Sequence, residues 1–354
     1  MLIGYSQTGS GANQIRCKYL TIVANQKQEN IEVFFFRQED VNIRDKTING
    51  LQYDIVIDKF VRKTFPYPDI IDCGGNAFPQ KPVKASLRSE SIFIHNRFGG
   101  KMAVYNMVKD SPCAKYFIEA CKYEDVDMNE LLDTYGEIII KPVGESLGQG
   151  IYKISKNGNN YNVHFKHNNS TVSAEEFRKT YDPKFKDGKH IIQEYFDSKT
   201  SHGNPFDIRV IVCRGKDGKW NYSEKFARIG HPEGVVSNLA AGGYIIAKGL
   251  DSFLEMNHGN NFRQINAEIN YIIDNVPEMI QSVFPYLICQ IGFDIGINID
   301  GKIKFFEING NPIYRSDEFN SAIARIGLYK YLYSNKSKIL QRQKNTDSKR
   351  RKKY

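Results

Sequence analysis

The segment 290–310 constrains the fold of this chain most, because two alternating apolar runs flank a strong turn signal. The runs read QIGFDIGINI and KIKFFEI, and Asp300-Gly301 between them favours a two-residue β-hairpin turn. With those two residues as the turn, Asp294 faces Glu307 directly across the two strands. The segment therefore predicts a hairpin that carries two acidic side chains in opposition.

Two carboxylates that oppose each other destabilise a sheet unless a cation compensates them. Asn309 follows Glu307 by two residues and so projects from the same face, while Gly292 opposite it would leave open space. Carboxylate and amide oxygens are hard ligands that suit Mg²⁺. We therefore predict a magnesium site formed by Asp294, Glu307 and Asn309, with an exposed polar face of a surface hairpin as the alternative.

The length and composition of the chain indicate a globular protein with more than one core. The 354 residues are 41% hydrophobic, which is enough apolar material for two or three cores. No stretch reaches the roughly 20 apolar residues of a membrane span, and the first residues do not read as a signal peptide. The six cysteines are scattered without a C-x-x-C pair, so we expect reduced thiols and a cytoplasmic protein.

The positive charge of the chain is concentrated at its C-terminal end. Residues 334–354 contain nine Lys or Arg and one Asp, so they carry +8 of the net +9 and leave about +1 for the rest. The remainder has no basic stripe interleaved with aromatic residues, which argues against a nucleic-acid surface. We expect a disordered, solvated basic tail; the alternative is a tail that contacts RNA, anionic lipid or an acidic partner.

Apolar runs predict the secondary structure along the chain. Residues 1–95 contain three β-like runs, at 20–24, 31–36 and 53–58, and indicate a small α/β domain. A helix is expected near 101–122, broken at Ser111-Pro112, and a strand-rich module follows. Further helices are expected at 261–285 and 318–333.

The order of several short motifs resembles the ATP-grasp superfamily. These motifs are Lys101, the strand lysine with its Gly-rich loop (IIIKPVGESLGQG), the QEY strand and the terminal D…E-x-N set. The strings DIRV, ARIGHPEGVVSNLAAGG and GFDIGI…FFEING are closer to the YheC/YheD-like group, described as spore-coat-associated. The resemblance implies an α/β (α+β) chain with an ATP-grasp fold. Its expected parts are a smaller N-terminal α/β domain at 1–95, the ATP-grasp domain at 96–333 with a lid at about 135–192, and the basic tail at 334–354.

The resemblance also implies roles for individual residues, and ATP and Mg²⁺ as cofactors. The group expected at the nucleotide is Lys101, Lys141, Gly144, Ser146, Gly148, Gly150, Glu194, Tyr195 and Phe196. The group expected at the transferred phosphoryl group or a substrate carboxylate is Arg209, Arg228, Asn238 and Arg315. The metal ligands would be Asp294, Glu307 and Asn309.

A site of this kind implies an ATP- and magnesium-dependent carboxylate–amine ligase that forms an amide or peptide-like bond through an acylphosphate. Its substrates would be a small-molecule or peptide carboxylate and an amine. One alternative is a kinase of the same fold acting on a polyol or inositol phosphate. The other is a non-catalytic, nucleotide-binding, coat-associated protein.

Overall fold

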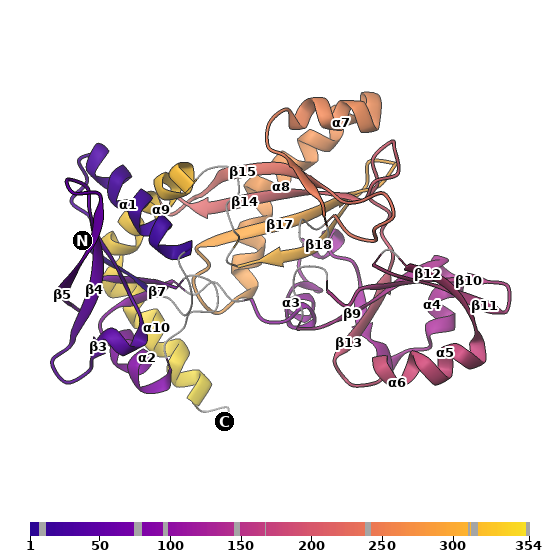
Figure 1. Cartoon of the computed structure of the whole chain (residues 1–354), viewed down its shortest axis with the longest axis horizontal. Coiled ribbons are helices and arrows are strands. Elements are labelled where there is room, and N and C mark those ends of the chain that lie inside the picture. Colours follow the sequence, from indigo (N-terminus) through magenta and orange to yellow (C-terminus); the bar gives the residue numbers. More distant parts are fainter. Residues whose placement is uncertain are drawn as a thin grey trace.

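The computed structural model is a mixed α/β protein, as predicted, with three β-sheets arranged in a row (Figure 1). Among the described helices, none combines the length and apolar character needed to cross a membrane. None of the six cysteines is paired in a disulfide bond within the described part of the chain. The described residues are 1–6, 12–73, 80–94, 98–144, 149–166, 168–237, 242–310, 312 and 318–351.

The first sheet has a parallel centre, in which β1 pairs with β2 on one side and with β6 on the other. The sheet order is β3-β4-β2-β1-β6-β7, and β5 pairs with β4. Strands in the middle of such a sheet are buried on both faces and read as continuous apolar runs, as β2 does. Its elements are β1 (Leu2–Ser6), α1 (Ala12–Gln26), β2 (Glu32–Phe36), β3 (Val41–Asn42), β4 (Thr47–Asp54), β5 (Lys59–Pro66), β6 (Ile70–Cys73), α2 (Lys81–Arg88) and β7 (Ile92–Ile94).

Two of the three strands predicted in this region were wrong or too long. Residues 20–24 lie in α1, because Cys17, Leu20 and Ala24 repeat at helical spacing and are buried together. The run 53–58 leaves β4 after Asp54, where the carboxylate accepts the Val56 N–H at 2.9 Å and starts a turn. Only the run 31–36 forms the predicted strand.

The second sheet forms the expected lid region and is antiparallel throughout, in the order β12-β11-β10-β9-β13-β8. One face packs against α4, α5 and α6, whereas Lys141 lies on the other face. Of the helix predicted near 101–122 with a break at Ser111-Pro112, only the part before the break forms, as α3 (Lys101–Val108), and 120–122 form a strand instead. The remaining elements are β8 (Ala120–Lys122), α4 (Met128–Tyr135), β9 (Glu137–Pro142), β10 (Tyr152–Asn157), β11 (Asn160–Phe165), β12 (Asn168–Ser173), α5 (Ala174–Thr180), α6 (Asp182–Phe185) and β13 (His190–Glu194).

The central sheet, in the order β16-β15-β14-β17-β18, positions the candidate site. Along β14 the residues alternate, so that Phe206 and Ile208 enter the core beneath α8 while Asp207 and Arg209 face the other side. Its elements are β14 (Phe206–Arg214), β15 (Trp220–Ile229), β16 (Tyr244–Ile246), α7 (Leu250–His258), α8 (Phe262–Val283), β17 (Gln290–Ile297) and β18 (Ile303–Asn309).

The predicted closing helix forms α9 (Glu318–Ser334), and it packs against the first sheet and the α1 helix (Figure 1). Arg325 on α9 forms a buried ion pair with Asp72 at the end of β6. The Tyr329 hydroxyl donates to the same carboxylate at 2.7 Å. The last part of the chain is therefore built into the N-terminal module.

The basic tail is helical over most of its length, contrary to our expectation of disorder. Residues Lys336–Arg351 form the helix α10, in which Gln343 is 9% exposed. Its side-chain amide donates to Ser91 O at 3.0 Å and its carbonyl accepts the Phe93 N–H at 3.0 Å. One buried polar side chain thus anchors a segment whose composition suggests disorder. Residues 352–354 lie outside the described part.

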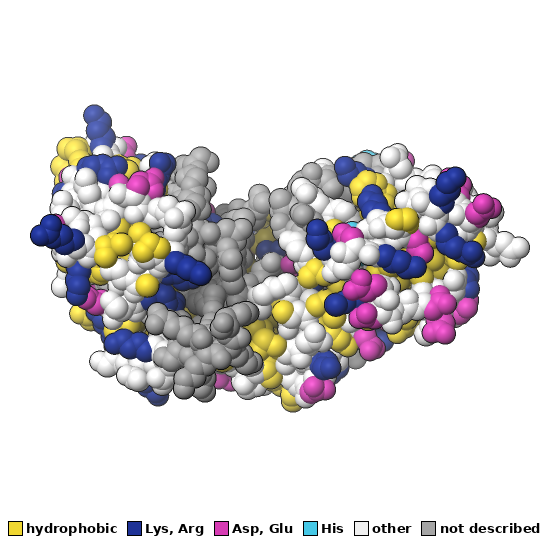
Figure 2. Space-filling model, turned by 90° about the horizontal axis from the view of Figure 1, so that it is seen from below, with side chains coloured by type: hydrophobic (Ala, Val, Ile, Leu, Met, Phe, Trp, Pro, Cys, Tyr) yellow, Lys and Arg dark blue, Asp and Glu magenta, His cyan; other side chains and the backbone are white. Residues whose placement is uncertain are grey.

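The surface view shows how charged side chains are distributed over one face of the molecule. In Figure 2, acidic and basic side chains are interspersed over the described parts of the lobe that contains the second sheet. This agrees with the near-neutral charge of residues 1–333, nine minus eight, or about +1.

Replacing Gln343 with Ala is expected to lower the free energy of unfolding by about 1–3 kcal/mol, because the buried Phe93 N–H loses its acceptor. Gln341→Ala is the matched control, since Gln341 is exposed on the same helix. The two variants are compared by urea unfolding. Equal stability of both would show that α10 contributes nothing through this contact.

Candidate functional site

The predicted opposition of Asp294 and Glu307 is confirmed, and Gly292 faces Asn309 as expected. Asn309 lies on the same face, because its side-chain amide donates to Asp294 Oδ2 at 3.4 Å. The space beside Gly292 is not open, however. A Cβ atom there would lie 2.7 Å from Pro312, so glycine is required by close packing.

The hairpin reaches this register by a route that the sequence did not predict. The turn is one residue longer than expected, since the Asn298 N–H donates to Lys302 O at 3.1 Å and Gly301 has a φ of +78°. A β-bulge then leaves Phe306 without a partner on β17, because Ile295 pairs with Phe305. The extra loop residue and the bulge cancel, so Glu307 returns to the position opposite Asp294.

Two guanidinium groups supply the positive charge that Asp294 requires. Arg209 lies directly opposite Asp294 on β14 and donates from Nε to Oδ1 and from Nη2 to Oδ2, the latter at 2.9 Å. Arg228 Nη2 lies 3.1 Å from Oδ2. Burial raises the pKa of Asp294, but these two cations outweigh burial and hold it below the usual range. The positive charge that the sequence analysis expected a cation to supply is therefore provided, for Asp294, by two arginine side chains.

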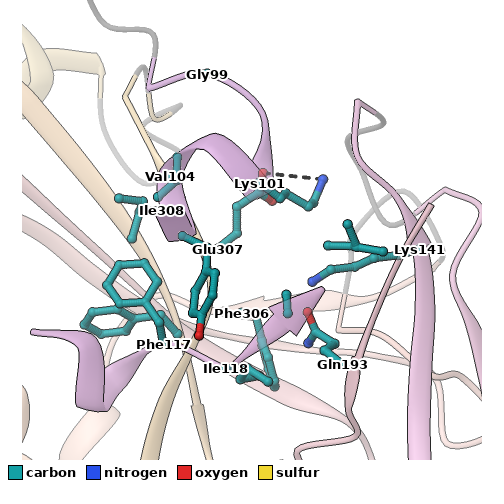
Figure 3. Close-up of a pocket in the computed structure, with 14 residues that line it drawn as sticks. Gly99, Lys101, Val104, Phe117, Ile118, Lys141, Gln193, Phe306, Glu307 and Ile308 are labelled. Atoms are coloured by element: carbon teal, nitrogen blue, oxygen red, sulfur yellow. Dashed lines mark ion pairs between the residues drawn. The ribbon is translucent and has the colours of Figure 1, made fainter. Parts of the chain in front are cut away.

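Glu307 lies between Asp294 and two lysines, Lys101 and Lys141. Lys101, the first residue of α3, places its Nζ 3.9 Å from Glu307 Oε1 (Figure 3). Burial and the nearby Asp294 raise the pKa of Glu307, against the opposing effect of Lys101. Burial and the charge of Lys101 lower the pKa of Lys141 to about 8. Acidic Glu307 and the basic Lys101 and Lys141 thus lie close together beside Asp294.

A pocket lies between the lid sheet and the end of β18. Figure 3 shows Lys101 and Lys141 on one side of it and the apolar Phe117 and Ile118 on the other. A pocket that is apolar in part and cationic at one end can take a flat ring with an anionic group. Its lining residues are Gly99, Lys101, Val104, Tyr105, Phe117, Ile118, Ala120, Lys141, Ile191, Gln193, Phe305, Phe306, Glu307 and Ile308.

Gln193 is a lining residue that sequence reasoning missed. It lies on the same face of the lid sheet as Lys141, and its amide can both donate and accept hydrogen bonds. Strand alternation was the available signal, because only one of the neighbours Gln193 and Glu194 can face the pocket. The structure places Gln193 there.

The other residues predicted at the adenine ring lie behind or beside the pocket. Tyr195 donates from its hydroxyl to Asp197 Oδ1 at 2.9 Å. Phe196 packs against Phe306, a residue of the pocket wall, with ring centroids 6.2 Å apart. Among the described residues, the side chains of Glu194, Tyr195 and Phe196 do not line the pocket, so their predicted contacts would come from the backbone.

The Gly-rich loop is described only at its two ends. A Cβ atom at Gly150, which has a φ of +69°, would lie 2.7 Å from Pro142, so this position favours glycine. Gly144 has open space around its Cα. Ser146 and Gly148, like Asn238 and Arg315 elsewhere in the chain, lie outside the described residues.

The candidate metal ligands fit Mg²⁺ in their chemistry. The part of the chain that the structure describes holds no group of three or more His, Cys, Asp or Glu side chains that could bind a metal. Asp294 and Glu307 are nevertheless paired across one face, and Asn309 adds an amide to them. Such a set of two carboxylates and one amide is typical of a magnesium site completed by phosphate oxygens and water.

Comparisons with known proteins agree with this fold. The chain resembles the crystal structure of N5-carboxyaminoimidazole synthetase from Staphylococcus aureus complexed with ADP. The TM-score is 0.52 at 10% identity, over 92% of this chain and 77% of that one, so the fold is of the ATP-grasp type.

Within that fold class, the chain belongs to the YheC/D-like ATP-grasp family, which matches residues 90–334. It is 22% identical over 304 residues to the endospore coat-associated protein YheD of Bacillus subtilis (strain 168), over 79% of this chain and 64% of YheD. It is 25% identical over 206 residues to YheC of the same organism, over 55% of this chain and 53% of YheC. The chain thus spans less than two thirds of either relative.

The affinity for ADP, measured without Mg²⁺, is expected to fall as the pH rises through about 8, because Lys141 loses its charge there. Lys141→Met should weaken binding at pH 7 by about ten-fold or more and should flatten this pH dependence. Lys153→Met is the control, since Lys153 lies in the same lid sheet and pairs with Glu137. Isothermal titration calorimetry measures each affinity. Unchanged binding by Lys141→Met would contradict the assignment of the pocket.

Proposed function

We propose that this protein is an ATP- and Mg²⁺-dependent ligase that joins a carboxylate to an amine through an acylphosphate. The observation that carries the proposal is a row of charged side chains beside the pocket. Lys101 contacts Glu307, Glu307 opposes Asp294, and Asp294 contacts the two arginines. Phosphoryl transfer requires positioning and charge neutralisation above all, and this row offers both.

Each part of the row would meet a different part of the reactants. Lys101 and Lys141 would bind the phosphates of ATP, whose ring would lie in the apolar part of the pocket. Asp294, Glu307 and Asn309 would hold Mg²⁺, which when bound neutralises charge on the phosphate oxygens. The guanidinium forks of the arginines suit the planar oxygens of a carboxylate or phosphoryl group.

The reaction balances in two steps. An oxygen of the acceptor carboxylate attacks the γ-phosphorus of ATP, the bond to the β–γ bridging oxygen breaks, and ADP leaves. The amine nitrogen then attacks the acyl carbon of the acylphosphate, phosphate leaves with the bonding electrons, and the nitrogen loses a proton. Lys141 on β9 belongs to the lid sheet, whose closure over the pocket would exclude water from the acylphosphate.

We keep two further proposals for the function of the same site, and both rank below the ligase. A hydroxyl of a polyol or inositol phosphate would accept the phosphoryl group in a kinase. The names of YheD and YheC favour a coat-associated protein, in which nucleotide binding serves no catalysis. A cytoplasmic location, and contact of the basic helix α10 with an anionic partner, also belong to this set of proposals.

Incubation with ATP, Mg²⁺ and a panel of carboxylates and amines is expected to release ADP and phosphate only when both a carboxylate and an amine are present. Asp294→Asn and Glu307→Gln should each lower this rate at least about 100-fold, because each removes a charge from the predicted metal site. Asp300→Asn, in the exposed turn of the same hairpin, should retain the rate. A stable phosphorylated product without amine would indicate the kinase. ADP release that is equal in all variants would exclude this site.

A further inference from the structure

Asp207 is a buried acid beside the candidate site to which the proposed reaction assigns no role. It lies on β14, two residues before Arg209 and on the same face, and it is 3% exposed. Both of its carboxylate oxygens have partners: Oδ1 accepts from Arg228 Nε at 2.7 Å, and Oδ2 accepts from the hydroxyl of Ser237. Asp207 therefore connects Arg228 on strand β15 with Ser237.

The contacts of Arg228 show what Asp207 achieves. Nε donates to Asp207 and Nη2 contacts Asp294 at 3.1 Å, so the guanidinium is fixed between two carboxylates. An arginine has five N–H donors, and these two contacts use two of them within the described part of the chain. The side chain is 15% exposed, so it is not fully closed off from solvent.

Arg214, at the far end of β14, provides a contrast. Its donors are taken up by Ile288 O, Gly218 O, Glu278 and Gln281. This arginine is a structural one, with four of its donors committed to the protein. Arg228, on the neighbouring strand β15, uses only two donors in its contacts with Asp207 and Asp294 among the described residues.

Stability alone does not account for the pair of Asp207 and Arg228. Burying two charges costs several kcal/mol in desolvation, and well-packed apolar residues of similar volume often stabilise a core as well or better. What a buried ion pair does provide is a fixed direction for the guanidinium. Here that direction is set within reach of the predicted metal ligand Asp294.

We propose that Asp207 is a positioning residue, which holds Arg228 and Ser237 so that the free donors of Arg228 bind the phosphoryl group that is transferred and then released as phosphate. This inference rests on the proposed function for its biological meaning. The anion site itself is testable without knowledge of the acceptor, because inorganic phosphate is a direct probe.

The test uses Asp207→Asn in the full chain, which keeps the size of the side chain and an oxygen acceptor but removes the charge. Inorganic phosphate is titrated into the protein by calorimetry, with and without ADP and Mg²⁺, and the affinity for ADP and Mg²⁺ is measured separately. We expect the affinity for phosphate to fall about ten-fold or more and that for ADP to change less than about two-fold. If Asp207 were merely structural, Asp207→Asn would lower the melting temperature but would not weaken phosphate binding more than ADP binding.

Two variants complete the design. Glu278→Gln removes the acidic partner of Arg214 and should leave phosphate binding unchanged. Arg228→Lys should lose phosphate affinity as Asp207→Asn does, and it tests the proposal if Asp207→Asn does not fold. The proposal is overturned if the wild-type protein binds no phosphate under either condition, or if Arg228→Lys retains wild-type affinity. Intact phosphate binding in a protein that shows no ligation would contradict the ligase proposal alone.

Discussion

The contact of Asp294 with two arginines is the interaction on which the candidate site depends. A carboxylate in the middle of a sheet, without partners, would cost several kcal/mol and would be expected to take up a proton. Arg209 and Arg228 keep Asp294 charged at neutral pH. The same three charges therefore hold neighbouring strands in register and provide groups that can bind phosphate and metal. Pairing of β14, β15 and β17 thus brings these three charged groups of the site together.

Much of the site was predictable because it follows from alternation along strands. The opposition of Asp294 and Glu307 and the placement of Asn309 needed only a period of two and the position of a turn. The exact loop length was not predictable, since nothing local distinguishes a tight turn from a longer loop followed by a bulge at Phe306. The prediction was right at Glu307 because those two irregularities cancel.

The errors have a common physical origin in long-range contacts. The run 20–24 has strand-like composition, but burial beside α9 selects the helix α1. The tail has the composition of a solvated segment, yet Gln343 finds backbone partners some 250 residues earlier in the chain. Gln193 was missed although strand alternation could have indicated it, and Asp207 was missed because its role comes from its contacts with Arg228 and Ser237 on other segments. Motif order, by contrast, was enough to identify the fold.

The buried pair of Asp72 and Arg325 has a consequence for any attempt to shorten this chain. The region matched by the family model, 90–334, includes α9, whereas the carboxylate that neutralises Arg325 lies before residue 90. A polypeptide limited to 90–334 would keep the arginine but lose Asp72 and the apolar surface of the first sheet that packs against α9. The boundaries of an independently folding fragment must therefore include both members of the pair.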